Sequence, residues 1–139
     1  MKAIITDLDR TLLHTDKSVS EHTIAVLKRC HDHGILIMAA SARPIRDILI
    51  YNNLIGFDAI TATNGAVISL HQKLLEIGIS CESGEKILSA ILEYPDVFLS
   101  IETNKGLYSN RDIPIWEPVI WDKFPTLPED IILYKILAS

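Results

Sequence analysis

The residues of this sequence best suited to chemistry are two aspartates near its N-terminus. Asp7 and Asp9 directly follow the apolar run Lys2–Thr6, which predicts a short buried β-strand. Alternate side chains of an extended chain point the same way, so both carboxylates should lie together, with Leu8 facing away. Paired like charges are costly unless a cation lies between them or a proton is shared. Mg²⁺ would offset that cost, because it prefers oxygen ligands.

A carboxylate held beside such a cation is suited to phosphoryl transfer. Asp7 would attack phosphorus to form an aspartyl-phosphate, while Asp9 would protonate the leaving oxygen and later activate a water. Thr11 and the backbone N–H groups after Asp7 would cradle the phosphate. On spacing alone, a loop or N-cap carboxylate pair explains the pattern equally well. Thr11 and Ser41 favour the chemical interpretation.

A second polar group follows the next predicted strand, residues 35–40. The hydroxyl and N–H of Ser41 would bind a phosphoryl oxygen, and Arg43 would add a charge-assisted contact. Pro44 suits the first position of a helix, whose N-terminus would also attract an anion. Strand ends of this kind meet at one edge of an open α/β sheet, which is where ligands bind.

The elements that must position these residues alternate along the chain. Three apolar runs predict strands: residues 2–6, 35–40 and 57–62. A helix should begin at Ser18, which has capping-box spacing to Glu21, and end at Gly34. The order β-α-β-α-β predicts an α/β fold with a Rossmann-like, doubly wound parallel sheet and right-handed crossovers. The unbroken apolar run at 35–40 predicts a strand covered on both faces.

Beyond the Asn64-Gly65 turn, the pattern changes. Residues 66–79 predict a hairpin that turns at His71-Gln72. The remaining predicted elements are a helix at 83–94, short strands at 97–103 and 107–110, a proline-rich loop at 114–128 and a last strand at 131–137. We expect two domains: a first half of a Rossmann-like core at 1–80 and a partial α+β cap at 81–139.

The motifs resemble those of one enzyme family. Residues 7–11 resemble the first motif, D-x-D-x-T, of the haloacid dehalogenase-like phosphatases. Residues 41–44 resemble the second motif of the Cof-type subclass IIB branch, and residues 64–66 match a further signature of that branch. Family members are Mg²⁺-dependent phosphatases that act mostly on sugar phosphates and other small phosphorylated metabolites.

The resemblance implies roles for individual residues. Asp7 would be the nucleophile, Asp9 the general acid/base and Ser41 a phosphate ligand. Mg²⁺ would be held by Asp7 and by Asp9 through its backbone carbonyl. Arg43 and Asn64 would lie near the substrate.

The sequence departs from the family in two ways. Arg10 replaces the usual glycine of the first motif, and its side chain would either shape the site entrance or point to solvent. The family's third-motif lysine and fourth-motif acidic residues have no clear counterpart, because no G-D-x-x-x-D-like segment exists. Lys135 is a candidate for that lysine, but its apolar surroundings fit a cap strand better. The chain is therefore expected to stop within the cap.

The missing strands have physical consequences. The family's first strand is central, so Ala3, Ile4 and Ile5 would form an exposed apolar edge. Mg²⁺ should bind weakly without carboxylates from the missing side. We expect the chain alone to be poorly active, and to form a homodimer or require a complementing C-terminal half.

Bulk composition narrows the function further. The chain has 139 residues and a net charge of −5, without a basic run, which argues against nucleic acid as a partner. No run approaches the roughly 18 apolar residues of a membrane span, and no signal peptide is evident. Two isolated cysteines, Cys30 and Cys81, fit a reducing compartment. A cytoplasmic protein is expected.

Two other functions remain open at this point. The chain could be a catalytically inactive remnant that serves as a binding or interaction module. It could also be a phospho-acceptor similar to response regulators, although the Thr11 motif and the cap-like second half argue against that. The exact substrate lies beyond the sequence, because the cap normally supplies specificity.

Overall fold

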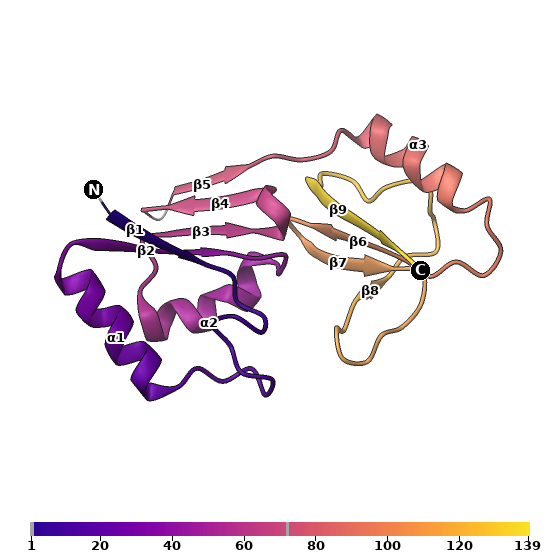
Figure 1. Ribbon diagram of the computed structural model, residues 1–139. Coiled ribbons are helices and arrows are strands. Elements are labelled where there is room, and N and C mark those ends of the chain that lie inside the picture. Colours follow the sequence, from indigo (N-terminus) through magenta and orange to yellow (C-terminus); the bar gives the residue numbers. More distant parts are fainter. Residues whose placement is uncertain (1, 72) are drawn as a thin grey trace. The chain divides into compact units, whose positions relative to one another are not determined.

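The computed structural model describes residues 2–71 and 73–139. The chain divides into two compact units, the first ending at Glu76 and the second beginning at Ile77 (Figure 1). Each unit is described by itself.

The first unit is built on a five-stranded sheet. Its strands are β1 (Lys2–Thr6), β2 (Ile35–Ala40), β3 (Ala59–Ala62), β4 (Val67–Leu70) and β5 (Lys73–Glu76), in the order β1-β2-β3-β4-β5. The first three are parallel and the last two antiparallel. The predicted α/β fold is confirmed, and β3 is shorter than the predicted 57–62. The turn expected at His71-Gln72 includes Gln72, which lies outside the described residues.

Two helices connect the parallel strands: α1 (Glu21–Asp32) and α2 (Ile45–Ile55). The predicted start at Ser18 is wrong. Ser20 is the N-cap, and its hydroxyl accepts the Thr23 N–H at 3.0 Å. Ser18 is instead held by Asp16, which accepts its N–H at 3.0 Å and its hydroxyl at 2.6 Å. Pro44 occupies the N-cap of α2 rather than its first helical position.

Both helices cover the same face of the sheet (Figure 1). Leu27 of α1 and Ile55 of α2 pack with Ile37 of β2 in one apolar core. Successive right-handed crossovers between neighbouring strands advance in one direction, which places their helices on one side. The expectation that β2 is covered on both faces is therefore wrong, since Leu36 and Met38 stay partly exposed on the other face.

Within residues 2–71 and 73–139, strand β1 lies at the edge of the sheet and pairs with β2 alone. Ala3 is exposed, Ile4 is partly buried and Ile5 is 68% exposed. The expectation of a buried strand is wrong. The expected exposed apolar edge is confirmed for Ala3 and Ile5, whereas Ile4 packs against the core beneath the sheet. Burial of β1 depends on neighbours that the described chain does not place beside it.

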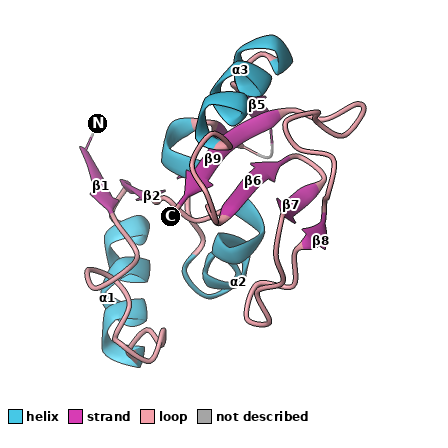
Figure 2. Ribbon diagram, turned by 90° about the vertical axis from the view of Figure 1, so that its right-hand side faces the viewer, coloured by secondary structure: helices cyan, strands magenta, loops and turns pink. Residues whose placement is uncertain are grey.

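The second unit packs one helix against a four-stranded sheet. Its elements are α3 (Cys81–Ile91), β6 (Leu99–Thr103), β7 (Gly106–Ser109), β8 (Val119–Ile120) and β9 (Leu133–Ala138). The strand order is β8-β7-β6-β9, and Figure 2 shows these strands side by side. Leu88, Leu99, Ile101 and Leu133 form the centre of its core. Lys135 lies on β9 opposite Glu102, so it belongs to this second sheet.

Within the described residues, every helix is too short or too polar to cross a bilayer.

Candidate active site

The turn after β1 is anchored by Leu8, which is fully buried. Its carbonyl accepts the N–H groups of Leu12 at 3.1 Å and Leu13 at 2.8 Å, so the backbone curls tightly around this residue. Asp7 is exposed and Asp9 is partly exposed. One buried leucine thus leaves the two carboxylates on either side of it accessible.

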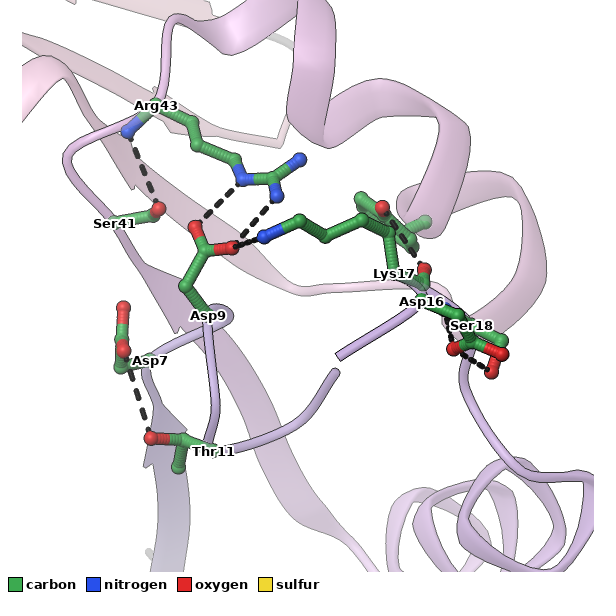
Figure 3. Close-up of polar contacts among 9 residues, drawn as sticks. Asp7, Asp9, Thr11, Asp16, Lys17, Ser18, Ser41 and Arg43 are labelled. Carbon is green, nitrogen blue, oxygen red and sulfur yellow. Dashed lines mark hydrogen bonds and ion pairs between the residues drawn. The ribbon is translucent and has the colours of Figure 1, made fainter. Parts of the chain in front are cut away.

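Asp9 is held by two cations (Figure 3). The Arg43 guanidinium donates from Nε to Oδ2 and from Nη2 to Oδ1, each at 2.7 Å. Lys17 Nζ donates to Oδ1, also at 2.7 Å. The hydrogen bonds from Arg43, followed by that from Lys17, hold the pKa of Asp9 well below its usual range. Asp9 raises the pKa of Arg43 in turn, so both groups stay charged.

Lys17 and Tyr51 belong to this cluster, although neither was among the residues predicted from the sequence. The buried Tyr51 donates its hydroxyl hydrogen to the Lys17 carbonyl at 3.1 Å, and the Arg43 guanidinium lies 5.8 Å from its ring centroid. Lys17 has a left-handed φ of 67° in the turn before α1. No motif spacing marks either residue, because a loop brings Lys17 to Asp9 and helix α2 brings Tyr51 beside Arg43 and Lys17.

Ser41 lies at the end of β2 and is buried. Its N–H donates to the Thr61 carbonyl at 2.8 Å, and its hydroxyl oxygen accepts the Arg43 N–H at 3.2 Å. The N–H is thus already bonded, so the prediction that it donates to the phosphate is wrong. The hydroxyl hydrogen remains able to donate to a ligand.

The segment after β3 is hydrogen-bonded to the segment that follows β2. Thr63, Asn64 and Gly65 have φ values of 51°, 57° and 98°, three successive left-handed residues. Thr63 N–H donates to the Arg43 carbonyl at 2.8 Å, and Asn64 N–H donates to the Ser41 carbonyl at 3.3 Å. A β-branched residue in this region is strained, which is typical of functional sites. Asn64 is thereby held next to Ser41.

Asp7 has a weaker environment than Asp9. Thr11 Oγ1 donates to Asp7 Oδ2 at a long 3.5 Å. In the view of Figure 3, the side chains of Asp7 and Asp9 both extend toward the side on which Ser41 lies. Arg10 adopts a φ of 61°, which accommodates the backbone geometry of the glycine it replaces, and it is exposed.

The residues present offer part of a magnesium site. The Asp7 carboxylate and the Asp9 backbone carbonyl are oxygen donors of the kind Mg²⁺ prefers. The Asp9 carboxylate fits less well, because Arg43 and Lys17 already neutralise it. Across residues 2–71 and 73–139, no group of three or more His, Cys, Asp or Glu side chains could hold a metal. A complete site would need water or further protein ligands.

Comparison with known proteins agrees with this geometry. The profile of the haloacid dehalogenase-like hydrolase family matches residues 4–133. The chain belongs to the haloacid dehalogenase-like hydrolases. It is 25% identical over 112 residues to the 5-amino-6-(5-phospho-D-ribitylamino)uracil phosphatase YwtE of Bacillus subtilis strain 168, an alignment that covers 81% of this chain and 39% of YwtE.

Solved structures show the same fold. BT1666 of Bacteroides thetaiotaomicron, a phosphatase of the haloalkanoate superfamily, superposes with a TM-score of 0.73 and 27% identity, covering 87% of this chain and 50% of BT1666. The subclass IIB sugar phosphatase BT4131 superposes with a TM-score of 0.62 at 22% identity, covering 78% and 44% of the two chains. The chain thus spans about half or less of these haloacid dehalogenase-like relatives.

Proposed function

We propose that this chain carries the nucleophile and phosphate-binding part of a phosphomonoester hydrolase. The observation that supports this proposal most directly is the tight turn after β1. This turn places Asp7 and Asp9 at the C-terminal end of β1, and Ser41 follows the C-terminal end of the neighbouring parallel strand β2. Asp7 and Asp9 are the catalytic pair, and Thr11 and Ser41 bind the phosphate. Arg10, Arg43 and Asn64 lie close to the substrate.

In the first half-reaction, an Asp7 carboxylate oxygen forms a bond to phosphorus while the bond from phosphorus to the leaving oxygen breaks. The leaving oxygen takes a proton from Asp9. In the second half-reaction, Asp9 removes a proton from water, whose oxygen attacks phosphorus and releases Asp7. Phosphate then leaves with the water oxygen.

The ion pairs of Asp9 constrain this sequence. A carboxylate bound by Arg43 and Lys17 carries no proton, so it is ready as a base but not as an acid. The first half-reaction therefore requires that these cations move from Asp9 and that the freed carboxylate takes up a proton from solvent; the substrate's phosphate is an alternative anion for the two cations. Thr11 and the Ser41 hydroxyl orient the phosphate oxygens meanwhile.

The proposed reaction also uses Mg²⁺. Asp7 and Asp9 would hold Mg²⁺, with Asp9 contributing its backbone carbonyl. When bound, the ion supplies charge that stabilises the phosphoryl oxygens during transfer.

The substrate class is a small phosphorylated metabolite such as a sugar phosphate. YwtE is a phosphatase of a phosphoribityl compound, and BT4131 is a sugar phosphatase. Residues 1–80 would form the core and residues 81–139 part of a cap, and the compact units ending and beginning at Glu76 and Ile77 support that division. The expected setting is cytoplasmic, with a homodimer or a complementing C-terminal half as the partner.

An inactive binding module is the alternative, and two observations favour it. Asp9 is neutralised by protein cations, and the described residues hold no cluster of three metal-binding side chains. Such a protein would bind phosphorylated compounds without hydrolysing them.

Hydrolysis of p-nitrophenyl phosphate, with and without Mg²⁺, distinguishes these functions. We expect slow Mg²⁺-dependent turnover that Asp7→Asn abolishes and that Asp112→Asn, a change at an exposed aspartate of the second unit, leaves intact. Turnover that survives Asp7→Asn would refute the nucleophile assignment. Phosphate binding without any Asp7-dependent turnover would favour the binding module.

A further inference from the structure

The cations that hold Asp9 carry more charge than this carboxylate can balance. Arg43 and Lys17 both donate to it at 2.7 Å, so two positive charges face one negative charge. Asp16, which precedes Lys17 in the chain, is turned to Ser18 and accepts its N–H and its hydroxyl hydrogen (Figure 3). The group of Asp9, Arg43 and Lys17, which we call the Asp9 cluster, therefore keeps one positive charge in excess.

Both cations are held in place by hydrogen bonds and by one buried side chain. The Lys17 N–H donates to the His14 carbonyl at 3.0 Å, and the Lys17 carbonyl accepts the Tyr51 hydroxyl at 3.1 Å. Tyr51 is only 5% exposed, and its ring centroid lies 5.8 Å from the guanidinium carbon of Arg43. The side chain of Lys17 is 56% exposed, so its ammonium group stays accessible. The positive charges are thus built into the site and can still reach a ligand.

The Asp9 cluster lies on the leaving-group side of the proposed active site. In the view of Figure 3, the Asp9 carboxylate lies between Asp7 and the Lys17 ammonium group. In the proposed reaction, Asp7 attacks phosphorus and Asp9 reaches the leaving oxygen, and these two oxygens lie in line on opposite sides of phosphorus. Thr11 and Ser41 serve the transferred phosphate. The cations beyond Asp9 therefore face the part of the substrate that leaves.

We infer that the leaving group of the substrate carries a second anionic group, a carboxylate or a further phosphate, which Arg43 and Lys17 bind. The inference rests on the proposed function and narrows its substrate class to phosphorylated acids and bisphosphates. A guanidinium fork and an ammonium group both suit the oxygens of such groups. The second anion also draws the two cations away from Asp9, which the proposed first half-reaction requires.

A preference for such substrates has to come from these local charges. The chain as a whole has a net charge of −5, so its long-range field disfavours an additional negative charge on a ligand. Exposed charges more than about 8–10 Å apart are largely screened at physiological salt. An anion bound by Arg43 and Lys17 would instead contact its partners directly. A phosphate monoester without a second anion would leave the excess charge of the Asp9 cluster unbalanced.

Binding of matched ligands tests the inference. The Asp7→Asn variant, which lacks the proposed nucleophile, is titrated in Mg²⁺ buffer at constant pH and ionic strength, and amide chemical shifts give the dissociation constants. 3-Phosphoglycerate is compared with glycerol 3-phosphate, which has a hydroxymethyl group in place of the carboxylate. Fructose 1,6-bisphosphate is compared with fructose 6-phosphate, which lacks the second phosphate. We expect the more anionic ligand of at least one pair to bind about five- to tenfold more tightly. The pair that shows the preference identifies the second group.

Lysine variants in the same Asp7→Asn background locate the contact. Lys17→Met removes one cation of the Asp9 cluster. Lys86→Met removes an ion-paired lysine of the second unit, whose ammonium nitrogen lies 2.6 Å from a Glu82 oxygen. The two lysine side chains are 56% and 74% exposed, so both variants should fold, as circular dichroism would verify. Lys17→Met should reduce the preference to less than about twofold. Lys86→Met should leave it unchanged, and Lys17→Arg, which keeps the charge, should retain it.

Two results would overturn the inference. One is equal affinity within both ligand pairs, since the transferred phosphate alone would then satisfy the site. The other is a preference that Lys17→Met and Lys86→Met reduce equally or leave unchanged, since charges elsewhere would then cause it. A Lys17-dependent preference in a chain without Asp7-dependent turnover of p-nitrophenyl phosphate would contradict only the proposed hydrolysis. Such turnover together with equal affinities within both pairs would contradict only this inference.

Discussion

Replacing Arg43 with Met tests the ion-pair cluster that controls Asp9. The variant keeps an unbranched apolar stem beside Tyr51 but removes both hydrogen bonds to the carboxylate, each 2.7 Å long. The Arg43 side chain is 20% exposed and the Asp9 side chain 39% exposed, so solvent weakens the pair only in part. Lys17→Met removes a single contact from a side chain that is 56% exposed.

The structure gives different magnitudes for these variants. A hydrogen bond to a charged group contributes about 1.5–3 kcal/mol, and exposed ion pairs contribute about 0–1 kcal/mol. With Asp9 between these limits, we expect Arg43→Met to lower the free energy of unfolding of the first unit by about 1–2 kcal/mol. Lys17→Met should lower it by less than about 1 kcal/mol.

Chemical denaturation measures both effects within one molecule. Trp116 and Trp121 are the only tryptophans of the chain and lie in the second unit, so their fluorescence follows that unit, while far-ultraviolet circular dichroism follows both. Arg43→Met should shift the dichroism transition without moving the fluorescence transition. Equal losses for Arg43→Met and Lys17→Met, or no loss for either, would refute the bidentate arrangement.

Other predictions concern acid stability, capping and packing. The pKa of Asp9 is lowered in the folded state from an ordinary value of 3.8. The stability that its ion pairs give the folded state should therefore be complete above that pH and be lost as the pH falls below it. Acid titration followed by circular dichroism would detect this loss. A constant stability across that range would contradict the ion pairs. Ser20→Ala should lower the free energy of unfolding, measured by urea denaturation, by about 1 kcal/mol because it removes the N-cap of α1. Ser18→Ala should lower it by less, and the reverse order would indicate that Ser18 is the cap. Gly84→Ala should destabilise the second unit by about 1–3 kcal/mol, because a Cβ at this position would lie 2.6 Å from Leu133 Cδ2. Denaturation followed by tryptophan fluorescence measures this effect, and an unchanged transition would show that Leu133 moves aside without loss of stability.

Local patterns predicted the elements that carry the site. The apolar run before Asp7, the run before Ser41 and the Asn64-Gly65 turn each appear where expected, because short-range periodicity and turn chemistry determine them. The start of α1 was misplaced because two serines compete for the cap. Ser18 is held locally by Asp16, a bond that competes with helix capping.

Features that depend on tertiary contacts escaped prediction. Burial of β1 could not be judged from its apolar residues, because it depends on which strands and helices lie beside it. Lys17 and Tyr51 were missed because their contacts with Asp9 and Arg43 join residues that are far apart in sequence or in loops without regular spacing. The sequence also could not show that the Ser41 N–H is already hydrogen-bonded, since its acceptor, the Thr61 carbonyl, belongs to another strand.

The central claim is that Asp7 attacks phosphorus, and trapping its phosphorylated form tests this most directly. The Asp9→Asn variant, incubated with acetyl phosphate and excess Mg²⁺, would lack the base that activates water and should retain one phosphoryl group. Mass spectrometry of peptides should locate that group on Asp7, and an Asp7→Asn, Asp9→Asn double variant should carry none. A phosphoryl group on another residue, or none on Asp7, would contradict the account.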